Sequence, residues 1–198
     1  MSETSIAPPP PEVHELAQAC VGFVQQALGF ALDYTAETLP VLDHHLRDQM
    51  REAGSAADLV TAAAGAYFGE VVRRRIMGAR WHSPAGEYRA WRLEFEPFFL
   101  WFNPLGNAVE AASGEASDGW NAHFQVLDEA RGEVERSLAA APELSEEDYF
   151  TLSMRLEVLE QVADLLGGLE VKQGKLRHFG PDVYRAAAGD ADAQMPPS

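Results

Sequence analysis

Glu70 is the residue whose type and surroundings come closest to those of a catalytic group. It lies in the run GAYFGEVVRRRIMGARW, from Gly65 to Trp81. In a helix, Glu70 shares an apolar side with Tyr67, and Arg73 and Arg74 follow at i+3 and i+4, where a carboxylate meets a guanidinium. A carboxylate buried beside a cation is an arrangement that enzymes use for general acid–base chemistry.

Two interpretations of this cluster stay open. In one, Glu70, Tyr67 and Arg74 form the centre of a small hydrolase or ligand-binding domain. In the other, which we favour, Glu70 belongs to an internal ion pair with Arg74 as the nearest partner and Arg73 as the second. Catalysis by a carboxylate normally needs a second titrating group. The sequence does not show which residue that would be, so we predict no catalytic residues.

The best candidates for metal ligands are Asp43, His44 and Asp48. His44 and Asp48 are four residues apart and would share one helix face, and both side-chain types bind divalent metals. Two such ligands do not make a site, and no HExxH motif is present. The glycine spacings match neither a P-loop nor a dinucleotide fingerprint. We therefore expect no metal site and no cofactor.

Charge and composition narrow the class of partner. The 198 residues carry a net charge of −16, with a pI near 4.6. Nucleic acid is an unsuitable ligand for such a chain, because phosphate binding depends on clustered lysine and arginine. A basic protein is the partner that this charge favours. The amino terminus lacks a signal sequence and the longest apolar run is too short to span a bilayer, which predicts a cytoplasmic protein without membrane contact.

The elements that would position Glu70 begin after a proline-rich leader. We expect residues 1–11 to be disordered and helices to run from about 12 to 28, 35 to 51 and 55 to 78. After Trp81 the period changes to two, so Trp91, Leu93 and Phe95 alternate with polar Arg92 and Glu94. A β-hairpin follows from this pattern. The segment 98–102, FFLWF, is either a strand buried on both sides or an interface, and we favour burial.

The rest of the chain is predicted to be helical. Asn103 and Pro104 start a short helix to about residue 112. Two long helices then form a hairpin around Pro142, the first containing Trp120, Phe124 and Leu127, the second ending at Gly167-Gly168. The predicted fold is α+β: one globular domain over residues 12–168, with a small antiparallel sheet packed on helices. Residues 169–198 form an extension with a disordered end.

Several of these residues resemble a known group of proteins. They are Leu32-Asp33-Tyr34, Thr38-Leu39, Leu42-Asp43, the run from Ala66 to Arg74, Gly78, Trp81 and Asn103-Pro104. Together they resemble a widespread group of uncharacterised bacterial cytoplasmic domains, over roughly residues 12–112. The resemblance implies a small α+β domain, in some members encoded near toxin–immunity or contact-dependent competition loci. It supplies no catalytic residue.

These observations favour a non-enzymatic, acidic protein–protein interaction domain. The resemblance extends this to an immunity-type inhibitor that covers a basic partner. The alternative is the hydrolase or ligand-binding domain centred on Glu70.

Overall fold

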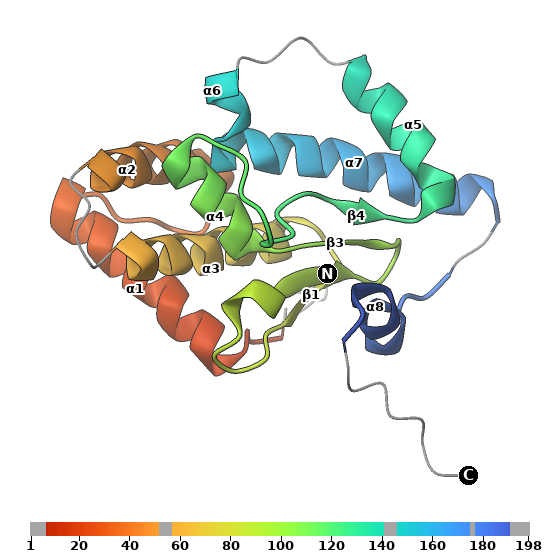
Figure 1. The fold of residues 1–198 in the computed structure, drawn as a ribbon, viewed down its shortest axis with the longest axis horizontal. Coiled ribbons are helices and arrows are strands. Elements are labelled where there is room, and N and C mark those ends of the chain that lie inside the picture. The colour runs from red at the N-terminus through yellow and green to blue at the C-terminus, as the bar shows by residue number, and fades with distance from the viewer. Residues whose placement is uncertain (1–6, 52–56, 141–145, 175–176, 191–198) are drawn as a thin grey trace, which may run out of the picture.

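The computed structural model describes residues 7–51, 57–140, 146–174 and 177–190. Its helices and strands alternate irregularly along the chain (Figure 1). The helices are α1 (Pro11–Leu28), α2 (Leu39–Arg51), α3 (Ala57–Arg75), α4 (Pro104–Ser113), α5 (Asp128–Ala139), α6 (Glu146–Tyr149), α7 (Leu152–Lys172) and α8 (Pro181–Ala188). The strands are β1 (Ala79–His82), β2 (Arg92–Phe95), β3 (Leu100–Phe102) and β4 (Gln125–Val126). The predicted α+β class is confirmed.

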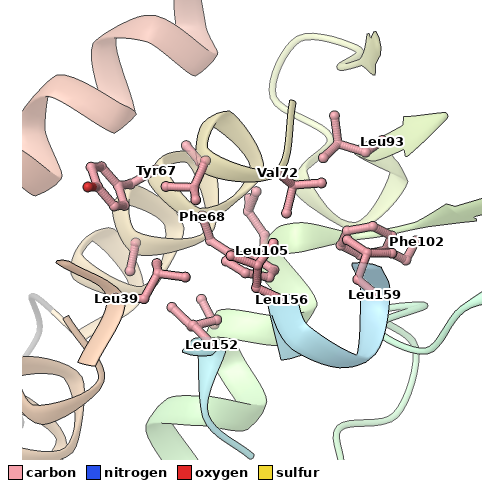
Figure 2. Packing of buried hydrophobic residues seen from close by; sticks show 14 of the residues in the cluster. Leu39, Tyr67, Phe68, Val72, Leu93, Phe102, Leu105, Leu152, Leu156 and Leu159 are labelled. Carbon is pink, nitrogen blue, oxygen red and sulfur yellow. The ribbon is translucent and has the colours of Figure 1, made fainter. Parts of the chain in front are cut away.

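The four strands form one antiparallel sheet in the order β1-β2-β3-β4. Trp81 is opposite Leu93 in the first pair, and Glu94 is opposite Trp101 in the second. Helices α3, α4 and α7 contribute to the main core against one face of the sheet, as Figure 2 shows. Helix α8 packs near the other face (Figure 1). The expected hairpin and apolar strand are present, and β4 is an addition that the sequence pattern did not predict.

Helix α3 is the central element of the main core. Every residue from Thr61 to Arg73 is buried. A helix that is apolar all round can be stable only if neighbours cover every side, and here α1 and α4 lie close along it. The close approach depends on glycine: a Cβ on Gly65 would lie 2.4 Å from the Cα of Leu105, and one on Gly69 would lie 2.2 Å from the Trp81 ring.

The segment 98–102 is covered on both sides, as favoured from the sequence. Leu100 and Phe102 belong to the main core. Phe99 and Trp101 form a second cluster with Phe179 and Tyr184. The Tyr184 hydroxyl accepts hydrogen bonds from the backbone N–H of Phe95 and Leu100 and donates to the Phe95 carbonyl at 2.5 Å. Helix α8 therefore closes the second face of the sheet.

This cover corrects the expected polar face of the hairpin. Arg92 and Glu94 are buried, with 2% and 1% of their surface exposed. Arg92 Nε donates to Glu94 at 2.9 Å, and Arg92 Nη2 donates to Asp190 at 2.8 Å. Arg80 Nε also donates to Glu94, at 3.0 Å. The alternation of apolar and polar residues assigned the side chains to the correct faces of the sheet. The face with the polar side chains is nevertheless buried, and its charged residues form an ion-pair network beneath α8.

Several predicted helix boundaries were wrong. The helix expected from Trp120 begins only at Asp128, because Trp120 to Leu127 form an irregular connection and β4. The last long helix does not stop at Gly167-Gly168 but continues to Lys172, since neither glycine has a positive φ there. The helix expected from residue 35 starts as a short 3-10 turn (Ala36–Thr38) before α2. The hairpin turn around Pro142 lies outside the described residues.

The ends of the predicted domain also carry structure. Ala7 lies within the described residues, and its carbonyl accepts a hydrogen bond from Arg73 Nη1 at 2.7 Å. Beyond residue 168, α8 contributes Tyr184, which is fully buried. Residues 1–6 and 191–198, which contain parts of the expected disordered ends, lie outside the described residues.

Candidate functional site

Glu70 is sealed inside the molecule by an arginine and a tryptophan. Its exposed fraction is 1%. Arg73 binds it with both nitrogens of one guanidinium edge, Nε to Oε1 at 2.7 Å and Nη2 to Oε2 at 2.8 Å. Trp81 Nε1 donates to Oε1 at 2.8 Å. The bidentate fork satisfies both oxygens, so Glu70 has the contacts of a structural ion pair.

The expectation that Arg74 is the first partner of Glu70 was wrong. Arg74 Nε lies 3.9 Å from Oε2, and its side chain is 44% exposed. Its guanidinium instead lies 3.8 Å above the centre of the Tyr34 ring. Arg73 is the main partner because its position on the helix directs its side chain inward. A bidentate hydrogen bond to a buried carboxylate is stronger than the exposed contact that Arg74 makes.

Tyr67 does not join Glu70 either. Its hydroxyl accepts from the Tyr34 N–H at 2.8 Å and lies 2.9 Å from Thr38 Oγ1. Burial raises the pKa of Tyr67 to about 12. The hydroxyl therefore stays protonated and joins α3 to the segment before α2. The three residues of the catalytic alternative face three different environments.

Asp43 caps helix α7. Its carboxylate accepts from the backbone N–H of Leu152 at 2.7 Å, the N–H of Ser153 at 3.1 Å and the Ser153 hydroxyl at 2.5 Å. Burial raises the pKa of Asp43, and the bonds from Ser153 and Leu152 act against that rise. These contacts satisfy helix N–H groups that lack partners in their own helix. Asp43 thus joins α2 to α7.

His44 and Asp48 form an exposed pair on α2. His44 Nε2 lies 3.2 Å from Asp48 Oδ2, with 67% and 42% of the side chains exposed. Asp43, which is buried against α7, points elsewhere. Within the described part of the chain, no group of three or more histidine, cysteine, aspartate or glutamate side chains has a geometry suited to a metal ion.

A cavity lies away from Glu70, between α5, α7 and the segment that contains β4. Its volume is about 730 Å³. Apolar walls come from Val126, Val134, Leu138 and Val158. Arg155 and Tyr149 also line it. This size lies within the roughly 300–1,000 Å³ of small-molecule pockets.

Sequence reasoning missed the ion pair beside this cavity. Glu110 on α4 is fully buried and accepts a hydrogen bond from Arg155 Nη2 at 2.6 Å. Ser117 N–H donates to the other oxygen at 3.0 Å, and His123 Nε2 lies 3.8 Å from that oxygen. The two partners are 45 positions apart in the chain, so no helical spacing could have paired them. The only sign of this pair in the sequence was that Glu110 and Arg155 are each a charged residue among the apolar positions of their helix.

Most arginines of the described chain lie within 4 Å of a carboxylate of the same chain. Those with such a contact are Arg73, Arg74, Arg75, Arg80, Arg92, Arg131, Arg136, Arg155, Arg177 and Arg185. The positive charge is therefore largely neutralised internally. Carboxylates without such a partner are left to dominate the surface.

Comparison with known proteins finds a family that is similar to part of the chain. Residues 5–94 match a family of unknown function (DUF6278). No curated protein and no solved structure matches the chain. The matched part runs from the start of α1 into β2, so β3, α4, α5, α7 and α8 lie beyond it.

The acidic excess lies mostly beyond this matched part. Residues 95–198 contain 19 acidic and seven basic side chains, whereas residues 5–94 contain 11 and eight. Among the described residues, no helix is long and apolar enough to cross a membrane.

Proposed function

We propose that this protein is a non-enzymatic interaction protein that binds a basic protein partner through the acidic carboxy-terminal part of its fold. The concentration of acidic side chains in residues 95–198 carries the proposal. Exposed carboxylates on α5 and α7 include Glu135, Glu157 and Asp164. Such a surface attracts basic partners, speeds their association and repels nucleic acid.

The geometry around Glu70 favours this function over the hydrolase alternative. A general acid or base must reach a proton of the substrate within hydrogen-bond distance or through one water. Glu70 is buried, and Arg73 and Trp81 occupy its oxygens. We therefore expect Glu70→Gln to lower stability while partner affinity stays nearly unchanged.

An immunity-type inhibitor is the specific form of this function that the resemblance to competition-associated domains supports. In that role the acidic surface would cover the basic active surface of a toxin. The site of action would be the cytoplasm. The part that matches the family would then act as the scaffold, and the acidic carboxy-terminal part would determine which partner binds.

The test compares two variants that change charge equally. The first, Glu135→Gln/Glu157→Gln/Asp164→Asn, alters the proposed surface. The control, Glu15→Gln/Glu37→Gln/Glu87→Gln, removes the same number of exposed carboxylates from the family-matched part. The full chain is used to capture its partner from a lysate of the cells that produce it, and the partner is then purified. Its dissociation constant is then measured by calorimetry.

The first variant should weaken binding about tenfold, because three exposed charge contacts together contribute on the order of 1–2 kcal/mol. The control variant should change affinity by less than about threefold. Binding should also weaken as salt rises from about 0.05 to about 0.3 M, since exposed charges are screened. Equal effects of the two variants, or affinity independent of salt, would refute the proposal.

A further inference from the structure

The cavity between α5, α7 and β4 has a buried cation at its edge. Arg155 has 5% of its side chain exposed. Its Nη2 donates to Glu110, and its Nε donates to the Tyr149 carbonyl at 3.2 Å. The residue lines the cavity. A guanidinium carries donors on all three of its nitrogens, so Arg155 can donate further hydrogen bonds to a ligand there.

The guanidinium is held rigidly in place. Glu110 fixes one edge, and the Tyr149 ring lies 4.4 Å from the guanidinium carbon. The fork is thus oriented before any ligand arrives, so little side-chain entropy would be lost on binding. His123, whose side chain is 56% exposed, lies at the rim of the same cavity and adds a second nitrogen.

The other walls are largely apolar. Val126 and Phe124 come from the segment around β4, Val134 and Leu138 from α5, and Val158 from α7. These apolar side chains offer no hydrogen-bond acceptor, and the charged residues Arg131 and Glu135 also line the cavity. The cavity therefore combines the fixed Arg155 with walls that favour hydrocarbon. The distant carboxylates of the protein oppose an anion little, because at physiological salt charges are screened beyond about 8 Å. The carboxylate that lines the cavity itself, Glu135, is accompanied there by the cations Arg131 and Arg155.

We propose that this cavity binds a small carboxylic acid with an apolar body, the carboxylate on Arg155 and the hydrocarbon between α5 and α7. A guanidinium binds carboxylate better than a neutral acceptor, because the bond is charge-assisted. Glu135 of the acidic surface also lines this cavity, but the inference does not depend on the proposed function.

The experiment uses the full chain and three ligands that share a ten-carbon body and differ in the head group: decanoate, decanol and decylamine. Calorimetry should show one decanoate per chain. Decanoate should bind about tenfold or more tightly than either decanol or decylamine. Decanol cannot form a charge-assisted hydrogen bond with Arg155, and decylamine would place a second cation beside it.

A cavity-filling variant locates the site. Val158→Trp places an indole in the cavity and leaves Arg155 and Glu110 themselves unchanged, and it should weaken decanoate binding at least about tenfold. The matched control is Glu157→Trp, one residue away on the exposed side of α7, which should change affinity by less than about threefold. Thermal melting checks that each variant is folded. If Val158→Trp does not fold, Leu138→Trp fills the same cavity from α5.

Three results would overturn the inference. Decanol or decylamine binding as tightly as decanoate would remove the role of the arginine. An equal loss in Glu157→Trp and the cavity variant would place the ligand elsewhere. Absence of decanoate binding to the full chain at about 1 mM, which corresponds to roughly −4 kcal/mol, would show that the cavity is not a site for such acids.

Discussion

At the scale of single residues, this fold is organised by buried carboxylates that each contact an arginine. Glu70 contacts Arg73, Glu94 contacts Arg92, Glu110 contacts Arg155 and Glu170 contacts Arg177. A buried pair adds little net stability compared with apolar residues of equal size, but the loss of one partner leaves a charge without compensation. These pairs therefore constrain how the helices and the sheet fit together.

Removing Glu70 tests this dependence. Glu70→Ala leaves Arg73 buried and unpaired, and should lower the free energy of unfolding by about 3–5 kcal/mol. The double variant with Arg73→Ala should lose less than the sum of the two single variants. Arg74→Ala is the control, because its exposed contact is worth less than about 1 kcal/mol. Chemical denaturation measures all four. A loss for Glu70→Ala as small as for Arg74→Ala would contradict the structural assignment.

His45 should make stability depend on pH. It is 4% exposed, its Nε2 has no hydrogen-bond partner in the part of the chain that the structure describes, and burial lowers the pKa of its imidazole. Below about pH 6.5 the unfolded chain binds this proton more readily than the folded chain, so the free energy of unfolding falls as pH falls. Between about pH 7.5 and 5.5, His45→Gln should show a shallower decline than the native chain. The exposed His14→Gln control should show the same pH dependence of the free energy of unfolding as the native chain. If His45→Gln also shows the native dependence, His45 is not its source.

At the scale of elements, α3 shows how small residues permit dense packing. Its two inner glycines lie where α4 and the Trp81 ring approach the helix backbone. Trp81 in turn donates its N–H to Glu70. Glycine in a helix is unfavourable relative to alanine by up to about 1 kcal/mol, so its presence here is explained by contact with neighbouring elements.

Two glycine-to-alanine substitutions separate packing from helix propensity. Gly69→Ala forces the Trp81 ring away and should destabilise the protein by about 1–3 kcal/mol. Gly22→Ala on α1 is the matched control, because among the described residues no atom outside the neighbouring backbone of α1 lies within 4 Å of its added Cβ. It should stabilise by up to about 1 kcal/mol. The melting temperatures of the two variants should therefore change in opposite directions. A higher melting temperature for Gly69→Ala would show that the space between α3 and the Trp81 ring can accommodate a methyl group.

At the scale of the whole molecule, the hydrophobic core contains residues from within the family match and from beyond it. Tyr67, Phe68 and Val72 from the matched part pack in one cluster with Phe102, Leu105, Leu156 and Leu159 from beyond it (Figure 2). Strand β2 also pairs with β3, which is outside the match. The two parts of the chain therefore share one hydrophobic core.

A fragment of residues 1–95 tests this unity. Without β3, α4 and α7 it would expose much of α3 to water, and burial of apolar surface is the main driving force for folding. We expect poorly dispersed amide resonances and no cooperative thermal transition, in contrast to the full chain. A sharp transition in the fragment would show that the matched part folds independently and that the carboxy-terminal elements are an addition to it.

The sequence by itself determined the class of the fold, the order of most elements and the burial of Glu70. These depend on local periodicity and on spacing within one helix, which one stretch of chain encodes. Where contacts join distant segments, the sequence was silent or misleading. Arg73 rather than Arg74 binds Glu70, Asp43 caps α7 rather than joining His44, and α8 buries Arg92 and Glu94. The tertiary structure decided these, because a charge takes the partner that burial brings within reach, and that partner can lie on any part of the chain.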